Sequence, residues 1–411
     1  MGALDGIRVL DFTQVILGPA ATQVLADHGA EVIKVERPGS GDLARSFAPF
    51  WRFDRGLSGT GQESVRFLAM NRNKRSLAVD LKAPEGRALI YRLLPRMDVL
   101  VHNFRPGVME SLGLGYETVR AINPRLIYAE GFGWGSRGPF AAAKRPGHEL
   151  LAQALAGLTA KNACSDGLPR QLPATVADFT ASQMLVQGIL LALLARQRSG
   201  AGQRVEVCLL DGLLALQQWD EVSRLNPSAA DPGVPDYHHP LQAVYRTADG
   251  FIALVGWFRP DPLANVCRAL GLPDYSHDPR FCTLDQMARP EHATALKTIL
   301  QERLATKTTA EWLAILDAHG VLCGEVLAPG EIWDHPQTGA NEMVVTIAHP
   351  ALGPVRLVGA PVKLSTTPAE MRRPPPLLGE HSRELLREVG LTEAEIEQLI
   401  ARGIVAESRA G

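Results

Sequence analysis

The sequence predicts an α/β protein with a large parallel-sheet domain and a smaller α+β domain inserted into it. Short β-branched runs alternate with helix-period segments in the first third of the chain. A polar, proline-rich stretch then interrupts the chain near residues 224–240, and a hairpin-like pattern follows it. At 411 residues the chain is too long for one ordinary hydrophobic core, so we expect two domains.

The first third predicts βαβ units. The β-branched runs that we expect to be strands are Ile7–Phe12, Glu31–Glu36, Asp98–Asn103 and Leu126–Phe132. The segments between them with apolar residues at helical spacing include Ala20–Gly29, Glu85–Arg96 and Tyr116–Ile122. Ligands of open α/β sheets collect outside the carboxyl ends of strands, which is where Asn103 and Gly131 fall.

The later elements define the domain boundaries. Residues 146–198 have a helical pattern, and Gln203–Trp219 reads as a strand leading into a helix. Beyond the linker, Leu241–Trp257 resembles a hairpin around Ala248–Gly250. Further helices are expected at 262–270, 290–306, 309–319 and 392–401, and further strands at 321–327, 342–348 and 354–358. We therefore place the large domain at 1–225, the small domain at 226–330 and the return to the large domain at 331–411.

Composition excludes several classes of protein. A net charge of −2 and 46% hydrophobic residues argue against a nucleic-acid binder and against a disordered chain. Five scattered cysteines, never spaced as CxxC, point to reduced thiols. The N-terminus lacks a basic leader, and no apolar stretch is expected to reach membrane-span length, so we expect a cytoplasmic protein. The adjacent His238 and His239 would point to opposite sides of an extended segment, so no metal site is expected.

Nucleotide-binding motifs are absent, yet cations gather near the predicted strand ends. There is no GxxxxGK[ST], and the segment after the first strand, "FTQVILGPAATQ", has no GxGxxG. The cations near the strand ends are Arg37, Arg72, Lys74, Arg75 and Arg105. They would suit a small polyphosphate, because Lys and Arg make charge-assisted hydrogen bonds to phosphate oxygens. The alternative is ordinary solvated surface charge.

The candidates for catalysis are a histidine and two carboxylates. GxSxG is absent, and no cysteine has an electropositive helix-start context. His148 and Glu149, in "RPGHELLAQ", and Asp178, in "PATVADFTASQM", each begin a helical pattern. Asp178 could simply be a helix N-cap, worth about 1 kcal/mol. A capping role and a catalytic role are compatible, since a helix N-terminus also favours the ionised form of a poorly hydrated carboxylate.

Taken together, long ordered stretches resemble the family III CoA-transferases, also called the CaiB/BaiF family, over nearly the whole chain. The matching segments are "GIRVLDFTQVILGPAATQVLADHGAEVIKVERPGSGD", "MNRNKRSLAVDLKAPEG", "DVLVHNFRPGVMESLGLGYETVRAINPRLIY", "GFGWGSRGPF", "RPGHELLAQALAGLTA", "VADFTASQMLVQGILLALLARQRSGAGQRVEVCLLDGLL" and "HPALGPVRLVGAPVKLSTTPAEMRRPPPLLGEHSRELL". The resemblance implies a Rossmann-like large domain built from both chain ends, and an intertwined homodimer of interlocked rings.

The resemblance also implies a mechanism. Asp178 would attack the thioester of a donor acyl-CoA to give a mixed anhydride, and CoA would then form an aspartyl-CoA thioester that the acceptor acid attacks. Acyl-CoA and a carboxylic acid would be the substrates, with no metal, no permanently bound cofactor, and no nucleic-acid or membrane partner. Glu149 matches an acidic position beside the nucleophile. The residues implied for CoA binding are Gln14, Val15, Leu17, Arg37, Lys74, Asn103, Phe104 and Arg105.

Some features depart from the transferase pattern. Ser111 stands where many transferases have an arginine, and "DPGVPDYHHP" replaces the glycine-rich loop of formyl-CoA transferases. His148 before Glu149 is similar to the related α-methylacyl-CoA racemases, so a 2-methylacyl-CoA racemase using His148 and Asp178 as acid and base is the alternative. His148 could also be a purely structural helix-start residue, and a non-catalytic acyl-CoA-binding protein is a third possibility. Arg259 with His238 and His239 suggests a dicarboxylic substrate such as succinate or itaconate.

Overall fold

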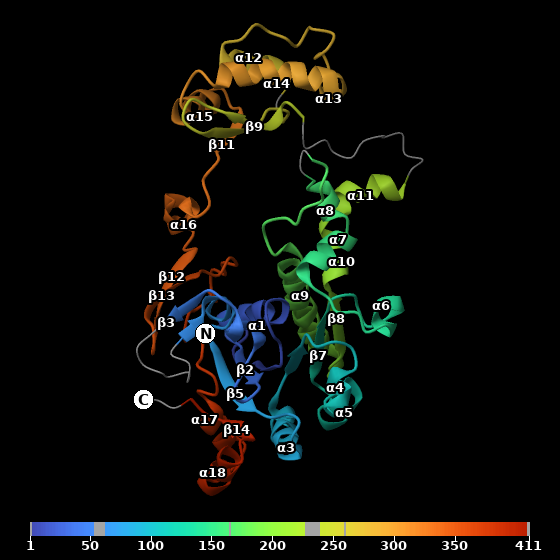
Figure 1. Cartoon of the computed structure of the whole chain (residues 1–411), viewed down its shortest axis with the longest axis vertical. Helices are drawn as coiled ribbons and strands as arrows, with labels where there is room; N and C mark the ends of the chain where they lie inside the picture. The colour runs from blue at the N-terminus through green and yellow to red at the C-terminus, as the bar shows by residue number, and fades with distance from the viewer. Residues whose placement is uncertain (1, 53–61, 164–165, 227–238, 259, 409–411) are drawn as a thin grey trace. The chain divides into compact units, whose positions relative to one another are not determined.

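The computed structural model describes residues 2–52, 62–163, 166–226, 239–258 and 260–408 (Figure 1). The chain divides into two compact units, one of Met1–Gln218 with Gly339–Gly411 and the other of Trp219–Thr338. These boundaries fall at 218 and 338, where the sequence suggested 225 and 330.

Unit 1 contains a seven-stranded sheet with the order β14-β5-β2-β1-β6-β7-β8. Its strands are β1 (Arg8–Asp11), β2 (Glu31–Glu36), β5 (Lys74–Val79), β6 (Val99–His102), β7 (Ile127–Phe132), β8 (Arg204–Cys208) and β14 (Val405–Ala406). All neighbours pair in parallel except β14, which is antiparallel to β5. The expected α/β fold with a parallel-sheet core is confirmed. The strand order reverses direction between β1 and β6, the position at which such sheets bind ligands.

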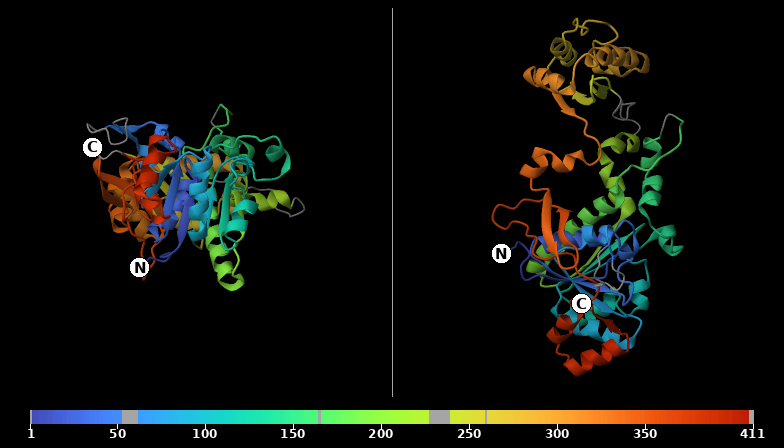
Figure 2. Two further views of the ribbon diagram at one scale, coloured as in Figure 1. Left: turned by 90° about the horizontal axis from the view of Figure 1, so that it is seen from below. Right: turned by 60° about the vertical axis from the view of Figure 1, so that its left-hand side comes forward.

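Strand residues alternate between two cores because successive side chains point to opposite faces of a sheet. Leu10, Ile33 and Leu100 belong to one core, whereas their neighbours Val9, Val32 and Val99 belong to the other. Helices cover both faces (Figure 2). The first core is completed by helices α3 (Pro84–Leu93), α5 (Tyr116–Ile122), α17 (Ser382–Glu388) and α18 (Glu393–Ala401), and the second by α1 (Leu17–Asp27), α7 (Glu149–Leu155), α9 (Val176–Ser199) and α10 (Leu209–Leu216).

Strand β5 was not predicted. Its sequence, KRSLAV, begins with two cations, yet all six residues are buried in the sheet, between β2 and the edge strand β14. The cations are accommodated because Lys74 pairs with Asp11 at 3.1 Å and Arg75 pairs with Glu31 at 2.6 Å. The pattern of apolar and polar residues therefore did not reveal this strand, because its charged residues are buried in ion pairs.

Helix α9 is the one described helix that is long and apolar enough to cross a membrane by length and composition alone. The expectation that no segment reaches that length was therefore wrong. Leu185 and Ile189 of α9 are fully buried within unit 1, so this helix is part of a protein core.

Unit 2 has a three-stranded antiparallel sheet and a core of its own. The expected hairpin is confirmed, because β9 (Gln242–Arg246) pairs with β10 (Phe251–Val255), which also pairs with β11 (Leu322–Glu325). Its helices are α12 (Pro262–Leu270), α13 (Leu284–Ala288), α14 (Pro290–Leu304) and α15 (Thr309–Ala318). Leu254, Leu296 and Trp312 are among the buried residues that pack together.

The other helices and strands follow in chain order. They are η1 (Leu43–Ser46), β3 (Phe50–Arg52), β4 (Gln62–Ser64), α2 (Val65–Met70), η2 (Leu94–Arg96), α4 (Val108–Ser111), α6 (Gly138–Ala142), α8 (Leu158–Lys161), α11 (Gln218–Leu225), η3 (Glu331–Asp334), α16 (Pro336–Ala340), β12 (Val344–His349) and β13 (Gly353–Val358). Strands β12 and β13 form a separate hairpin, and β14 is the strand that the C-terminal part adds to the main sheet.

Candidate active site

A cavity of about 820 Å³ in unit 1 lies at the carboxyl ends of the central strands. Its walls come from the loops after β1, β6 and β7 and from the first turns of α7 and α9. The cavity brings together residues that are far apart in the sequence and that the sequence analysis named as candidates for catalysis or CoA binding. They are Gln14, Val15, Leu17, Asn103, Phe104, Arg105, His148, Glu149 and Asp178. Arg37 and Lys74 do not line it.

Asp178 is not the N-cap of α9. The N-cap is Thr175, and Asp178 is the third residue of the helix. The backbone N–H groups of Ala177 and Asp178 donate to the two carboxylate oxygens of Glu149, at 2.9 and 2.8 Å. A residue of α7 therefore caps α9, and the free N–H groups that we expected to stabilise Asp178 are bound to Glu149.

This arrangement raises the pKa of Asp178 to about 7. The main cause is burial, and the nearby charge of Glu149 and a hydrogen bond between the two carboxyl groups act in the same direction. The backbone N–H of Leu17, the first residue of α1, donates to Asp178 and opposes the rise. The expectation that the helix N-terminus keeps Asp178 fully ionised is corrected: near neutral pH it is poised between its two protonation states.

Glu149 is itself held in place by its neighbours. Its side chain is 5% exposed, and Gln153, one turn later on α7, donates to its Oε1 at 2.7 Å. The Gln153 Oε1 accepts from the backbone N–H of Leu172, in the segment that leads into α9. Glu149 and Gln153 together fix the start of α9 and so the position of Asp178.

A contact between two glycines brings α7 against the sheet edge. A Cβ on Gly147 would lie 2.3 Å from the Cα of Gly133, and a Cβ on Gly133 would lie 2.4 Å from the Cα of Gly147. Gly133 follows β7, and Gly147 precedes His148 and Glu149. Only glycine allows this close approach of two backbones.

We predict that Gly147→Ala lowers kcat by on the order of 10²-fold, because a displacement of about 1 Å in a catalytic group costs that much. Steady-state kinetics on the folded variant measure this. Gly339→Ala is the control, since a Cβ there meets nothing within 4 Å. An equal loss of activity in both variants would contradict the role of the glycine contact.

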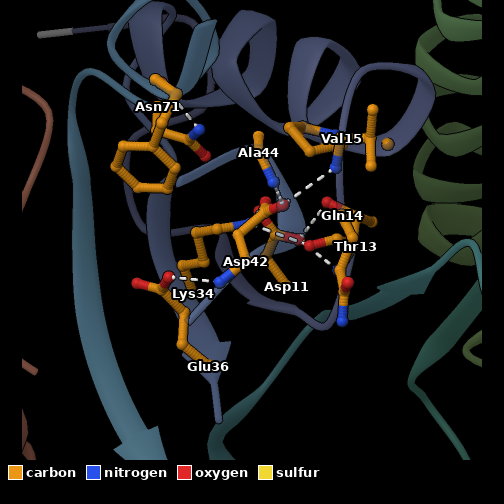
Figure 3. A network of polar contacts seen from close by, with 12 residues as sticks. Asp11, Thr13, Gln14, Val15, Lys34, Glu36, Asp42, Ala44 and Asn71 are labelled. Carbon is orange, nitrogen blue, oxygen red and sulfur yellow. Dashed lines mark hydrogen bonds and ion pairs between the residues drawn. The ribbon is translucent and has the colours of Figure 1, made fainter. Parts of the chain in front are cut away.

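The loop between β1 and α1 is fixed by side chains from two other segments, one after β6 and one at the start of η1. Asn103 accepts a hydrogen bond from the Gln14 N–H at 2.8 Å and donates to the Gln14 carbonyl at 2.7 Å. Val15 has a left-handed φ of 69°, and its N–H donates to Asp42 at 3.0 Å. Polar backbone in this loop therefore keeps one conformation at the cavity wall (Figure 3).

His148 is the N-cap of α7. Its Nδ1 accepts a hydrogen bond from the backbone N–H of Leu150 at 3.2 Å, and the residue is exposed at the cavity. Because Nδ1 accepts, the proton of the neutral ring lies on Nε2. A structural role for His148 is thus present, and its place in the cavity wall is compatible with a further role.

The basic residues that line the cavity are mostly not the ones that the sequence predicted. Arg72 pairs with Asp27 at 2.7 Å, Lys74 pairs with Asp11, and Arg37 is exposed away from the cavity wall. The cations that line the cavity are Arg66, Arg105, Lys144 and Arg145. The sequence reading missed Arg66, Lys144 and Arg145, although "AKRPGHE" places two of them just before Glu149.

The family follows from comparison with known proteins. The model of CoA-transferase family III matches residues 4–382. The chain belongs to this family. It is 34% identical to a mouse succinyl-CoA:glutarate CoA-transferase, over 98% of this chain and 91% of that protein. It is 32% identical to a succinyl-CoA–D-citramalate CoA-transferase of Chloroflexus aurantiacus, over 98% of each chain. A solved structure of Rv3272 from M. tuberculosis is 34% identical, with a TM-score of 0.81, covering 94% of this chain and 99% of that one.

For this CoA-transferase, the phosphate contact expected of Lys74 is corrected. The side chain is fully buried, and its Nζ donates to Asp11, Asn71 and the Pro19 carbonyl. Ser111, which stands where many transferases have an arginine, donates to the Val108 carbonyl of its own helix.

We predict that Lys74→Met destabilises the fold by about 3 kcal/mol, because it leaves the buried Asp11 carboxylate without its 3.1 Å partner. Urea unfolding measures the change. A raised KM for acyl-CoA with unchanged stability would instead restore the phosphate role.

The residues behind the dicarboxylate suggestion are only partly described. Arg259 and His238 lie outside the described residues. His239 is 2% exposed in unit 2, and its Nδ1 accepts from the Leu241 N–H. No group of three or more His, Cys, Asp or Glu among the described residues could hold a metal ion. The described cysteines Cys208, Cys267, Cys282 and Cys323 are unpaired, and Cys164 lies outside the described residues.

Proposed function

We propose that this CoA-transferase moves CoA from an acyl-CoA thioester to a carboxylic acid with Asp178 as the covalent nucleophile. The observation that carries the proposal is the position of Asp178. Its carboxyl group faces a cavity large enough for an extended thioester, and contacts Glu149 and the Leu17 N–H. A poorly solvated carboxylate fixed at a cavity wall suits nucleophilic attack.

The steps conserve atoms and charge. The ionised Asp178 oxygen attacks the thioester carbonyl, the C–S bond breaks, and CoA leaves as a thiolate while an aspartyl–acyl anhydride forms. The thiolate then attacks the aspartyl carbonyl and expels the donor acid as a carboxylate. The acceptor carboxylate attacks this aspartyl thioester, which expels CoA as a thiolate and forms a second anhydride, between Asp178 and the acceptor. The thiolate finally attacks the acceptor carbonyl of that anhydride, which gives the new acyl-CoA and frees the Asp178 carboxylate.

CoA is proposed to lie along the loop after β1. The backbone of Gln14, Val15 and Leu17, with Asn103 and Phe104, would contact the pantetheine or the adenine. The cations in the cavity wall, Arg66, Arg105, Lys144 and Arg145, supply charge for the phosphates, and Arg37 could add to them from outside it.

A dicarboxylic acid such as succinate or itaconate is proposed as donor or acceptor. The support is that two relatives carry succinyl-CoA in their names, with glutarate or D-citramalate as the second substrate. A panel of mono- and dicarboxylic acids with succinyl-CoA, assayed by mass spectrometry, tests this. Equal turnover of the two classes would contradict the preference.

A trapping experiment tests the nucleophile. The enzyme is incubated with succinyl-CoA, and then with hydroxylamine or borohydride, and the peptide that contains Asp178 is analysed by mass spectrometry. Hydroxylamine should convert Asp178 to a hydroxamate, and borohydride should reduce the aspartyl thioester to an alcohol. Absence of any adduct with every competent donor would contradict the covalent mechanism.

The racemase alternative rests on His148 and Asp178 sharing the cavity. It predicts exchange of the α-hydrogen of 2-methylacyl-CoA with deuterium from solvent, abolished in His148→Ala. Under the transferase proposal His148→Ala still forms the Asp178 adduct. A protein that only binds acyl-CoA would give neither adduct nor exchange.

An intertwined homodimer is proposed as the working form, in the cytoplasm. Supporting it, α9 and α10 expose large apolar side chains that a monomer would leave in water. Those on the two helices are Leu190 (41% exposed), Leu191 (67%), Leu194 (53%), Leu214 (53%) and Leu216 (52%). Light scattering should give twice the chain mass, and Leu191→Glu should lower the dimer fraction.

A further inference from the structure

One buried ion pair is tied to the loop that faces Asp178. Lys34 on β2 and Asp42 are both fully buried and lie 2.8 Å apart, Nζ to Oδ2. Figure 3 shows both side chains beside the loop after β1, close to Asp11 and Thr13. Burying two charges is costly and is offset only when further hydrogen bonds satisfy them, so the other contacts of this pair are informative.

Those contacts go to the backbone of the loop. The Lys34 Nζ donates to the Thr13 carbonyl at 2.8 Å. The Asp42 Oδ1 accepts from the Val15 N–H at 3.0 Å and from the Ala44 N–H at 2.8 Å. The pair thus holds the loop at two points, with Gln14 between them held by Asn103.

The loop needs such ties because Val15 is strained. A β-branched residue at φ 69° is unfavourable and persists only where surrounding structure enforces it. Two residues later α1 begins at Leu17, which lies in the same cavity wall as Asp178 and whose backbone N–H lowers the pKa of that carboxyl group. The conformation of Val15 therefore sets the direction of the one backbone donor that this loop gives to Asp178.

We propose that Lys34 and Asp42 are positioning residues: their buried ion pair holds Thr13 and Val15 so that the Leu17 N–H meets Asp178 and the loop is pre-formed for acyl-CoA. The inference rests on the proposed function of Asp178. It assigns a catalytic consequence to two residues that do not line the cavity themselves and that act on it only through the backbone they hold.

The ionisation of Asp178 also depends on the charged groups of the helices and strands that pack against α9. Glu149 on α7 raises its pKa, and His148 precedes it in the same cavity wall. The other charged residues on these elements are Asp27 on α1, Glu130 on β7, Arg204 and Glu206 on β8, and Asp211 on α10. Asp27 pairs with Arg72, and Glu130 pairs with Arg204. Loss of the Leu17 contact should therefore leave burial and Glu149 unopposed, and the ionisation of Asp178 should move to higher pH.

The test uses two variants of the full-length enzyme. Asp42→Ala removes the acceptor for Val15, and Lys34→Met/Asp42→Leu removes both charges and leaves no unpaired ion. In each variant we expect about a tenfold higher KM for succinyl-CoA. We also expect the pH midpoint for ionisation of Asp178 to rise by about one unit, so that the Asp178 adduct forms about tenfold more slowly at pH 6. The matched control is Arg72→Met/Asp27→Leu, a buried pair at the far end of α1. It should lower the melting temperature and leave KM and the pH midpoint unchanged.

Amide hydrogen exchange on the wild-type enzyme keeps the inference testable if a variant does not fold. The Val15 and Leu17 amides should exchange slowly, and rapid exchange of either would overturn the proposal. Folded variants with wild-type KM and pH midpoint would overturn it too, as would equal shifts in the Arg72/Asp27 control. Absence of any adduct in the wild-type enzyme would instead contradict the proposed function, while leaving the exchange result to decide whether the loop is held.

Discussion

Asp178→Ala is expected to lower CoA transfer by roughly 10⁴-fold or more, because removal of a covalent nucleophile leaves only binding and positioning effects. The cavity wall that would contact CoA is otherwise intact, so Kd for CoA should change little. Initial rates of succinyl-CoA consumption, with binding followed by calorimetry, measure the two quantities separately.

Asp211→Asn is the matched control for that substitution. Asp211 also lies in the first turn of a helix, α10, but it does not line the cavity. Near-normal rates are expected in this variant. A fall of less than about tenfold in Asp178→Ala would remove Asp178 from the mechanism.

Removal of the Asp178 carboxyl group should also stabilise the protein at alkaline pH. The folded-state pKa of Asp178, about 7, lies above the ordinary value of 3.8, so its contribution to stability is fully present below pH 3.8 and is lost as pH rises to 7. Asp178→Asn avoids that loss, and we expect a gain of roughly 2 to 4 kcal/mol at pH 8 that vanishes near pH 4. Urea unfolding at the two pH values measures it.

Adduct formation should follow the ionisation of Asp178, because only the carboxylate attacks. Burial, followed by the charge and hydrogen bond of Glu149, places that pKa at about 7. The acylation rate should therefore fall about tenfold for each pH unit below 7 and level off above it. Single-turnover quenched-flow measurements from pH 5 to 9 would give this limb directly.

Glu149→Gln separates the two roles of Glu149. It removes the like charge, so the acidic limb should move to lower pH, by about one unit. It also leaves only one side-chain oxygen for the N–H groups of Ala177 and Asp178, so the plateau rate should fall. Gln153→Glu is a useful comparison, because it adds a second charge beside Glu149 and should move the limb the other way. An unmoved limb in Glu149→Gln would contradict the coupling of the two carboxyl groups.

The sequence predicted the parallel-sheet fold well because its strands β1, β2, β6 and β7 are short runs bounded by helix-period segments. It did not predict β5, since Lys74 and Arg75 are buried through ion pairs with Asp11 and Glu31, partners that are distant in sequence. A pattern of polarity along the chain carries no information about such partners.

The candidate site was predicted in its members and less well in its contacts. Asn103, Glu149 and Asp178 were singled out from their motifs, and the structure gathers them at one cavity. That Glu149 caps the helix of Asp178 could not be inferred, because it depends on the packing of α7 against α9. The wrong expectation that Lys74 contacts phosphate has the same origin as the missed strand. In the sequence, a cation that faces solvent near a strand end cannot be distinguished from one that is buried in the core.

The carboxyl pair has a thermodynamic consequence for the proposed reaction cycle. In the free enzyme the two acids lie beside each other in a poorly hydrated part of the cavity wall, and the ionised form of Asp178 carries the cost of burial and of the Glu149 charge. Acylation turns Asp178 into an uncharged anhydride or thioester, so the repulsion from Glu149 ends when the covalent bond forms. The free energy of the resting enzyme is thereby raised toward that of the high-energy covalent intermediates. A reaction that exchanges one thioester for another of nearly equal energy benefits, because its successive states come to lie at similar heights.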